Sequence, residues 1–541
     1  MWNDILVSRL QLVLALCAVG LVGWGCALAR AGREGFAKRE RDYALLFLGG
    51  LGALAYANFG HLHFGNFIHA WDTYHYYLGS KYFPELGYDR LYDCTAVADA
   101  EGGLREQVAR RTLTDLRTNL RVGTQDLLEH PERCKASFSP QRWSAFTSDL
   151  AWFRGRVSAS KWEMMQHDHG YNATPVWNIA GHALSSLAPA SDTQVLLLNL
   201  IDPLLLLAMA AMIQWAFDLR VLAVVLLVFG TGYPHRFYWT GGAFLRHDWL
   251  FLTVASVCLL RKQRPALAGF ALAYATALRL FPAFLAVGPL LLLAERWRTT
   301  RRLDSALVRF FGAALVSGLL LGAAGAALSG GPNAYQRFFQ NTAKHAATPL
   351  TNHMGLKTVL SYRPAAAGSA LRDMKAIDPW GLWKQARLSA FAQVKWLFVA
   401  LALGAVCLLY FSIRGPDVTP WMAAALSATL IAVGAELTCY YYCFILAVAL
   451  LHQVRREVGL VLLGFVAATQ VVAWAPLPGM ARWEDDVYVA MSCCALLALG
   501  AVLWLFTERG RAGALPLEPA LALAPQPPSR RGPAQKKHPR R

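Results

Sequence analysis

Apolar runs of about 17 to 25 residues recur along the whole chain and restrict its possible folds more than any other feature. A helix of roughly 20 apolar residues is long enough to cross the hydrocarbon core of a bilayer. Hydrophobic residues make up 56% of the 541 positions, whereas charged residues make up only 16%. The sequence therefore predicts an all-α polytopic membrane protein rather than a soluble one.

We expect about thirteen transmembrane helices, which make residues 1–506 one membrane domain. The expected spans are residues 5–29, 43–60, 193–217, 221–233, 243–260, 266–279, 281–295, 305–329, 391–412, 421–435, 438–452, 458–475 and 487–506. The sixth with the seventh, and the tenth with the eleventh, are short enough to form tilted or partly buried hairpins. Two long segments, 61–192 and 330–390, stay outside the bilayer.

Lys and Arg gather in five short clusters, and their placement predicts the orientation of the spans. The clusters lie at residues 30–41, 261–264, 296–302, 455–456 and 530–541. With thirteen spans all five fall on one side of the membrane, and an excess of Lys and Arg in short loops marks the cytoplasmic side. The two long segments are then extracytoplasmic loops.

The formal net charge of +18 follows from these clusters. Because the basic residues lie in loops between apolar runs and in the tail, we expect membrane lipids and no nucleic acid as partners. Residues 507–541 are rich in Pro, Ala and Arg, so we expect a disordered basic cytoplasmic tail that is attracted to lipid headgroups.

The first extracytoplasmic loop carries helical patterns of its own. Charged and apolar positions alternate at helical spacing in 104–129 and 141–156, and 175–187 is typical of an amphipathic helix on a membrane surface. Such a loop can roof a cavity in the outer leaflet, or it can be a purely structural cap. Cys94 and Cys134 lie in this loop, and an oxidising compartment would let them pair, although two unpaired thiols are the alternative.

Asp72 is the residue that most directly suggests chemistry. It stands in Trp71-Asp72-Thr73-Tyr74-His75-Tyr76-Tyr77, which we expect to open the polar loop directly after a span. A carboxylate where membrane meets water is partly desolvated, which raises its pKa toward the working range of a general base. The structural alternative is an acid that accepts hydrogen bonds from loop amides or a helix start.

Two other kinds of site are not indicated by the sequence. No Cys and His spacing fits zinc, and no Walker or GxGxxG loop occurs in a strand-to-helix context. His61, His63, His69 and His75 fit interfacial histidines better than a metal site. We therefore expect neither a metal site nor a nucleotide-binding domain.

Three groups of short motifs resemble one family. They are Asp72, Tyr76, Tyr77, Gly87 and Tyr92; then Leu245-Arg246-His247-Asp248 with residues 264–269, 277–282 and 295–298; and lastly residues 436–442. With them, residues 45–460 resemble the integral-membrane C-type (GT-C) glycosyltransferases, most of all the bacterial family 87 enzymes that use polyprenyl-phosphate sugars and are typically mannosyltransferases. The chain departs from that pattern at Arg246-His247-Asp248, where relatives tend to have a Gly-Gln-x-Asn-like stretch, and at Arg279, where Lys is common.

The resemblance implies an inverting hexosyltransferase of the bacterial inner (plasma) membrane, with its active site on the extracytoplasmic face. Its donor would be a polyprenyl-phosphate sugar and its acceptor a glycan, a lipid or a protein. No cofactor is implied, and the use of a divalent metal stays open. Such a transfer needs a base for the proton of the acceptor hydroxyl and cations for the leaving phosphate.

These roles can be assigned to particular residues. Asp72 is the expected base, and Arg279 is the expected principal phosphate ligand because a guanidinium grips phosphate with two parallel hydrogen bonds. Arg279 could instead snorkel to lipid headgroups. Arg246 and His247 could add to the phosphate site with Asp248 as an orienting partner, or Arg246 and Asp248 could simply neutralise each other.

Weaker candidates complete the expected site. Tyr76, Glu436 and Tyr440 could contact the acceptor, although an interfacial aromatic belt explains the tyrosines as well. The second extracytoplasmic loop could line the same cavity with Lys344, His345, Asn352 and His353. Asp202 could be an inward-facing packing acid.

Two other functions stay open. One is a transporter or lipid flippase whose buried charges mark a substrate path. The other is a ligase that moves a whole lipid-linked glycan. The sequence shows no internal inverted repeat of the kind many transporters contain, and one large early loop favours the enzyme.

Overall fold

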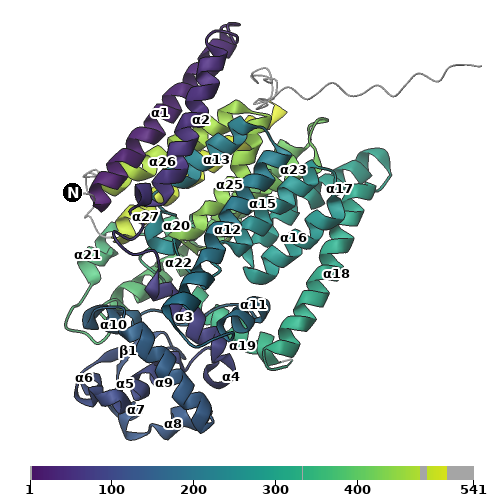
Figure 1. Cartoon of the computed structure of the whole chain (residues 1–541). Coiled ribbons are helices and arrows are strands. Elements are labelled where there is room, and N and C mark those ends of the chain that lie inside the picture. Colours follow the sequence, from purple (N-terminus) through teal and green to yellow (C-terminus); the bar gives the residue numbers. More distant parts are fainter. Residues whose placement is uncertain (1–2, 332, 475–483, 509–541) are drawn as a thin grey trace, which may run out of the picture.

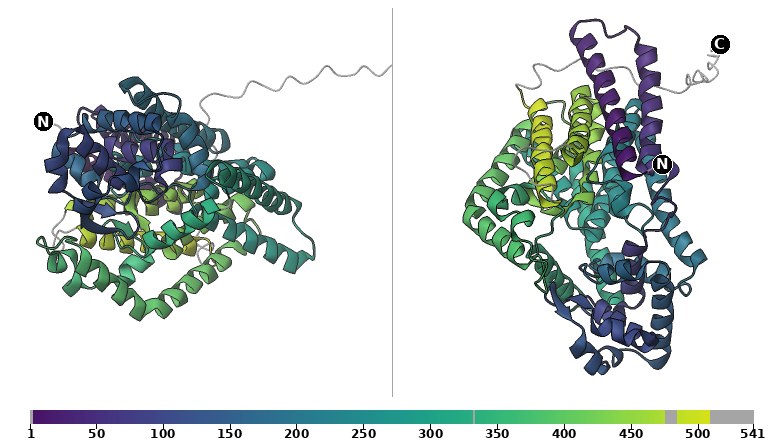
Figure 2. Two further views of the ribbon diagram at one scale, coloured as in Figure 1. Left: turned by 90° about the horizontal axis from the view of Figure 1, so that it is seen from below. Right: turned by 90° about the vertical axis from the view of Figure 1, so that its left-hand side faces the viewer.

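The computed structural model of the protein describes residues 3–331, 333–474 and 484–508. A bundle of long apolar helices carries a smaller lobe at one end (Figure 1). The side view in Figure 2 places that lobe at the end opposite to the loop between α1 (Asp4–Arg30) and α2 (Lys38–Tyr56). Two short antiparallel strand pairs occur in the described part, β1 (Thr112–Asp115) with β2 (Leu120–Gly123), and β3 (His353–Met354) with β4 (Leu437–Thr438).

Six helices of the described chain are long and apolar enough to cross a membrane, by length and composition. They are α1, α12 (Asp192–Ala216), α18 (Ser305–Leu328), α22 (Gly381–Ile413), α26 (Arg456–Trp474) and α27 (Glu484–Leu505). Shorter helices lie between them, namely α13 (Leu219–Thr231), α15 (Asp248–Arg261), α16 (Pro265–Leu278), α17 (Val287–Thr300), α23 (Pro420–Ser427), α24 (Ile431–Gly434) and α25 (Ile445–Ala449). These elements indicate a multi-pass all-α membrane protein, and the number of thirteen spans stays a prediction.

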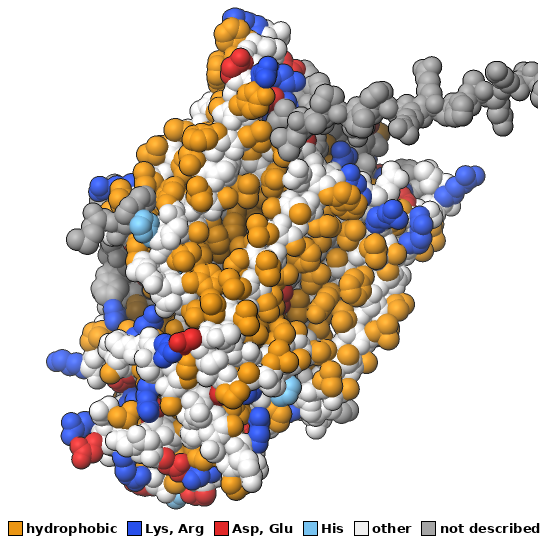
Figure 3. Space-filling view, viewed as in Figure 1, with side chains coloured by type: hydrophobic (Ala, Val, Ile, Leu, Met, Phe, Trp, Pro, Cys, Tyr) orange, Lys and Arg blue, Asp and Glu red, His pale blue; other side chains and the backbone are white. Residues whose placement is uncertain are grey.

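The surface of the bundle is broadly apolar. Figure 3 shows hydrophobic side chains covering the helices, with charged side chains gathered on the lobe and in the loops at the opposite end. On α18 the exposed fractions of Leu315, Leu319 and Leu320 are 65%, 66% and 67%. An apolar face of this extent is not stable in water, and lipid chains are its natural environment.

Small residues let the helices approach closely, as is common between helices in membranes. α2 crosses α13 at Gly52 and Gly230, where a Cβ on Gly230 would lie 1.7 Å from the carbonyl oxygen of Gly52. α16 crosses α18 at Gly269, where a Cβ would lie 2.1 Å from the carbonyl oxygen of Phe310. Larger side chains at these crossings would force the helix pairs apart.

Four of the five basic clusters lie at the end of the bundle away from the lobe, and contacts between loops hold them there. Arg456 donates to Glu34 at 2.8 Å, Arg296 donates to the carbonyl of Val418 at 3.0 Å, and the Arg261 guanidinium lies 5.3 Å from the ring centre of Trp421. The clusters at 30–41, 261–264, 296–302 and 455–456 therefore share one end, as the predicted alternation of spans requires. The fifth cluster and the predicted disordered tail beyond residue 508 lie outside the described residues.

Residues 61–192, predicted to be the first extracytoplasmic loop, fold into the lobe. Its helices are α3 (Ala70–Lys81), α4 (Phe83–Leu86), α5 (Leu91–Asp99), α6 (Arg105–Ala109), α7 (Gln125–Glu129), α8 (Glu132–Lys135), α9 (Pro140–Arg154), α10 (Ala159–Met165) and α11 (Pro175–Ser185). The predicted helices at 141–156 and 175–187 are present as α9 and α11. The helical prediction over 104–129 is wrong in its centre, where β1 and β2 form a hairpin. Its turn contains Asn119 at a left-handed φ of 59°, a conformation that asparagine tolerates better than most residues.

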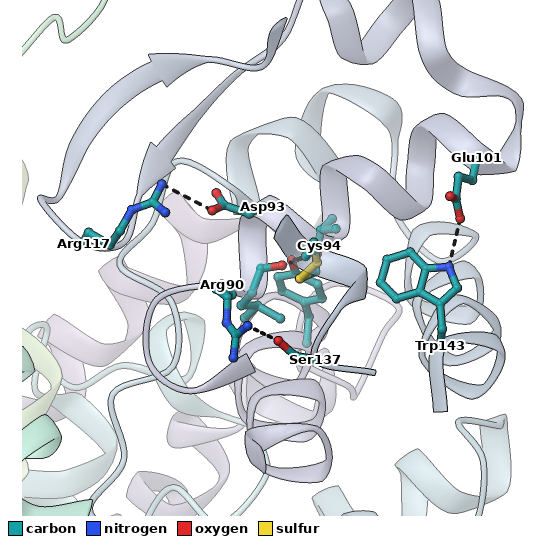
Figure 4. Close-up of a disulfide and its surroundings, with 11 residues drawn as sticks. Arg90, Asp93, Cys94, Glu101, Arg117, Ser137 and Trp143 are labelled. Carbon is teal, nitrogen blue, oxygen red and sulfur yellow. Dashed lines mark hydrogen bonds and ion pairs between the residues drawn. A yellow bond between two sulfur atoms is a disulfide. The ribbon is translucent and has the colours of Figure 1, made fainter. Parts of the chain in front are cut away.

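A disulfide joins Cys94 of α5 to Cys134 of α8, with 5.5 Å between the Cα atoms (Figure 4). Polar contacts surround it. Arg117 pairs with Asp93 at 3.4 Å, and the indole of Trp143 donates to Glu101 at 2.9 Å. The bridge ties α5 to the segment that leads into α9.

The second long loop, predicted to be extracytoplasmic over 330–390, is shorter than predicted, because α22 begins at Gly381 rather than near residue 391. It contains α19 (Asn333–Ala346), α20 (Leu356–Ser361) and α21 (Gly368–Leu371). The β3–β4 pair attaches it to the segment that follows α24, with His353 opposite Thr438.

Candidate functional site

The start of α3 is fixed by the approach of segment 61–69 to segment 241–247. The amide of His69 donates to the carbonyl of Gly242 at 2.9 Å. Gly242 has a φ of +64°, and a Cβ there would lie 1.9 Å from the carbonyl oxygen of Phe67. Only glycine allows this approach. It brings the first turn of α3 beside the residues that lead into α15.

Asp72 lies in the first turn of α3, at the beginning of the polar segment that follows α2. The imidazole of His69 caps the helix, and its Nδ1 accepts the amide of Asp72 at 3.0 Å. Asp72 is buried, and its Oδ2 has no hydrogen-bond partner among the described residues. Burial raises the pKa of Asp72 above its usual range, and the charges of Arg246 and His75 oppose this shift in part.

Arg246 is the cation that the fold places against Asp72. Its Nε lies 3.5 Å from Asp72 Oδ1, and its Nη1 donates to the hydroxyl of Tyr76 at 2.9 Å. The alternative in which Asp248 neutralises Arg246 does not fit this geometry, because no ion pair joins them within the described structure and Asp248 Oδ1 instead accepts the amide of Trp249 at 2.7 Å. Arg246 and Asp72 are far apart in the sequence and meet only in the fold.

Tyrosine rings surround the Arg246 guanidinium. Its carbon lies 4.8 Å from the ring centre of Tyr440, 5.1 Å from that of Tyr76 and 5.7 Å from that of Tyr441. Cation–π contacts stabilise a desolvated cation without neutralising it. The Tyr76 hydroxyl in turn donates to Asn172 at 2.7 Å, so Tyr76 connects the cation to the segment before α11. Tyr76 and Tyr440 therefore lie beside a buried cation rather than in a lipid-facing belt, and their contact with an acceptor stays a prediction.

Arg279 stands at the end of α16 and faces the same tyrosine. Its guanidinium carbon lies 5.8 Å from the ring centre of Tyr76. Nη1 donates to the carbonyl of Leu278 at 3.0 Å, while Nε and Nη2 are buried without a partner in the described part of the chain. Burial of Arg279, which is 8% exposed, does not fit a side chain that snorkels to headgroups. A buried guanidinium with two unused donors is prepared to bind an anion.

His247 is held by Asp202 of α12. Asp202 Oδ2 lies 2.5 Å from His247 Nδ1, and its Oδ1 accepts the amides of Arg246 and His247, each at 2.7 Å. Asp202 is 1% exposed and faces the bundle interior, as predicted, but it does more than pack. It fixes the backbone from which Arg246 reaches Asp72.

Glu436 lies in a separate group of residues. It pairs with Lys357 at 2.7 Å and accepts the hydroxyl of Thr358 at 2.9 Å, and His353 lies 3.7 Å away. Among the other candidates of the second loop, Lys344 donates to the carbonyl of Leu116, and the carbonyl of Asn352 accepts the amide of Cys439 at 2.9 Å. Glu436 thus anchors the second loop, and its oxygens already have partners.

Sequence reasoning missed Asp168 and Asn172. Asp168 accepts the indole N–H of Trp71 at 2.6 Å, which places a second carboxylate beside the first turn of α3. Burial raises the pKa of Asp168, but the hydrogen bond from His169 and the charge of His75 outweigh burial, and the pKa lies below its usual range. The polar stretch His167-Asp168-His169 before α11 was the available signal. Nothing in its spacing linked it to Asp72.

No group of three or more His, Cys, Asp and Glu side chains suited to a metal ion occurs among residues 3–331, 333–474 and 484–508. The fold and site define an all-α protein of multi-pass type with a buried carboxylate and two buried guanidinium groups between its lobe and its bundle. No protein-family model, curated protein or solved structure matches the chain.

Proposed function

We propose that the protein is a membrane glycosyltransferase that moves a hexose from a polyprenyl-phosphate sugar to an acceptor hydroxyl on the extracytoplasmic face. The proposal rests on one observation: two buried charged groups near Tyr76 each have polar atoms without a hydrogen-bond partner in the described chain. Asp72 has a free buried oxygen, and Arg279 has two free buried donor nitrogens, Nε and Nη2. Leaving such groups unpaired costs roughly 1–3 kcal/mol each, or more when they are charged, which favours a substrate that satisfies both.

The chemistry follows from these two groups. Asp72 accepts the proton of the acceptor hydroxyl while that oxygen attacks the anomeric carbon. The bond from this carbon to the phosphate oxygen breaks, and the charge of the departing polyprenyl phosphate is held by Arg279, with Arg246 as the second cation. A single displacement of this kind inverts the anomeric centre. The raised pKa of Asp72 suits a base that must take a proton and release it again.

The apolar surface supports a lipid-borne donor. A polyprenyl tail would remain among the lipids that contact α18 and its neighbours while the phosphate enters between the helices. The basic clusters at the opposite end support an extracytoplasmic position of the lobe in a bacterial inner membrane.

Purified protein in nanodiscs should be incubated with a panel of polyprenyl-phosphate hexoses and candidate glycan, lipid and peptide acceptors. Release of polyprenyl phosphate together with a glycosylated acceptor is the expected result. A flippase would move the donor without breaking this bond, and a ligase would require a donor that carries a whole glycan. Failure of every monosaccharide donor, by a protein that remains folded, would reject the proposal.

A further inference from the structure

We propose that Asn119, Asn341 and His345 form an acceptor subsite that binds a polyhydroxylated group, a sugar residue of a glycan acceptor. This inference rests on the proposed function and names its substrate class. The three residues come from the hairpin turn of the lobe and from α19, and we call them the amide cluster.

The amide cluster contains an unusual concentration of unsatisfied polar atoms. Asn341 is 6% exposed, and neither its Nδ2 nor its Oδ1 has a partner among the described residues. The same holds for Asn119 Oδ1 and His345 Nε2. Buried polar groups are nearly always paired in folded proteins, so four unpaired atoms in one place indicate a missing occupant.

Contacts within the described chain hold the cluster together. Asn119 Nδ2 donates to Thr348 Oγ1 at 3.0 Å and lies 3.4 Å from His345 Nδ1. Asn341 stands one helical turn before His345 on α19, so both side chains project from the same helix face. Lys344 is directed to the carbonyl of Leu116 and is already used.

The free hydrogen-bond donors and acceptors of the amide cluster indicate which class of ligand it can bind. If His345 Nδ1 accepts from Asn119, the neutral ring carries its proton on Nε2, and burial lowers its pKa to about 3 and keeps it neutral. The free atoms are then two donors and two acceptors without formal charge. Sugar hydroxyls, which both donate and accept, match such a set. A phosphate would require cations, and an acyl chain would leave all four atoms unpaired.

A ring contact and two polar contacts lead from the cluster to the residue beside the proposed base. The His345 ring lies 5.9 Å from the ring of His169, and His169 Nδ1 lies 3.3 Å from Asp168. Asp168 accepts from Trp71, the neighbour of Asp72 on α3. Because these residues separate the cluster from Asp72, the sugar held in the cluster is not the one that reacts. We therefore expect acceptors with two or more sugar residues to be used best.

The test uses the donor identified for the wild-type protein and octyl glycosides of one or two hexoses as acceptors. The variant is Asn341→Leu, which keeps the size of the side chain and removes its amide. We expect the KM for the octyl disaccharides to rise about 10-fold, as for the loss of one or two hydrogen bonds, with the donor KM unchanged. Gln340→Ala, which removes an exposed amide of the same helix, should change neither value.

Stability and a simpler acceptor separate recognition from structure. Removing an unpaired buried amide should not lower the Tm, whereas a structural amide would. The KM for 2-octyloxyethanol, which offers one hydroxyl and no sugar, should not change. An unchanged disaccharide KM in Asn341→Leu, an equal rise for 2-octyloxyethanol, or use of lipid or peptide acceptors alone would overturn the subsite. Wild-type protein that transfers no hexose at all would instead reject the proposed function, and equilibrium dialysis of a radiolabelled disaccharide with the wild type and Asn341→Leu would then decide on the subsite independently.

Discussion

Asp202 and His247 are joined by a hydrogen bond of 2.5 Å, and the second oxygen of Asp202 accepts two successive backbone amides at 2.7 Å. One buried carboxylate of α12 therefore holds the segment that carries Arg246 to Asp72. Asp202 touches none of the proposed reacting atoms, so its role is one of positioning.

Asp202→Ala should lower both stability and activity. It leaves buried donors of Arg246 and His247 unpaired, and we expect a loss of roughly 2 kcal/mol or more in the free energy of unfolding. Asp202→Asn keeps an oxygen that can accept both amides, so it should retain most of the transfer rate. Thermal unfolding in detergent and donor KM measure the two effects. Equal loss of activity in both variants would show that the charge, not the positioning, is what matters.

The orientation of the lobe can be tested with single introduced cysteines in intact cells. A membrane-impermeant maleimide added from outside should label Asp126→Cys in the lobe and Ala365→Cys in the second loop. It should not label Gln263→Cys at the end that carries the basic clusters. All three positions are exposed, so accessibility depends on the side of the membrane. Wild-type protein supplies the background from native thiols, and outside labelling at Gln263 would contradict the predicted orientation.

Asp93, beside the disulfide, should make stability depend on pH. Burial raises its pKa to about 6, although Arg117 opposes the shift. The pKa of Asp93 in the folded protein therefore lies above its pKa in the unfolded chain. For this reason the contribution of Asp93 to the stability of the fold is fully present below a pH of about 3.9 and is lost as the pH rises through about 6. Asp93→Asn keeps an uncharged side chain at every pH.

Asp93→Asn should therefore have a higher Tm than the wild type at pH 8. The difference in Tm between the two proteins should be larger at pH 8 than at pH 5. The exposed pair Asp126 with Arg133 provides the control, because Asp126→Asn should show no such difference. A lower Tm than wild type at pH 8 would mean that the ion pair with Arg117 outweighs the burial of Asp93.

Apolar runs made the helical bundle predictable, because a segment such as α18 must form its backbone hydrogen bonds internally in lipid. Local composition also predicted α9 and α11. The hairpin at 112–123 was missed because its short strands show charge alternation that also fits a helix, and the turn depends on one left-handed residue, Asn119.

The candidate site was predictable only in part. Asp72 and Arg279 could be recognised as charges at the edges of apolar runs. The pairing of Arg246 with Asp72 rather than Asp248 could not, since it depends on the approach of Gly242 to Phe67 and on the capping by Asp202. Likewise, Asp168 reaches α3 through the indole of Trp71, a contact between distant segments that leaves no periodic pattern.

Asp72→Asn should reduce the transfer rate by about 10²-fold or more, because general-base catalysis contributes typically 10² to 10⁴. The variant keeps the shape of the side chain, so expression and Tm should remain close to wild type. In the wild type, the rate should fall at low pH with an apparent pKa above the ordinary aspartate value, since burial raises the pKa of Asp72 and only the carboxylate accepts the proton. Asp126→Asn in the lobe is the matched control. Near-normal transfer by Asp72→Asn would make Asp72 a structural acid.

Arg279→Ala should nearly abolish use of the lipid donor. The guanidinium of Arg279 has two buried donors free for a phosphate, and removing a preorganised donor to developing negative charge typically lowers the rate by about 10²-fold or more. Arg279→Lys should reduce donor use several-fold, because an ammonium cannot present paired donors. Arg264, exposed at the opposite end of α16, supplies the control, and Arg264→Ala should leave donor KM and rate unchanged. If Arg279→Ala were folded, monodisperse and fully active, the phosphate would have to bind at Arg246 alone, and the arrangement of the two guanidinium groups around Tyr76 would have no part in holding the donor.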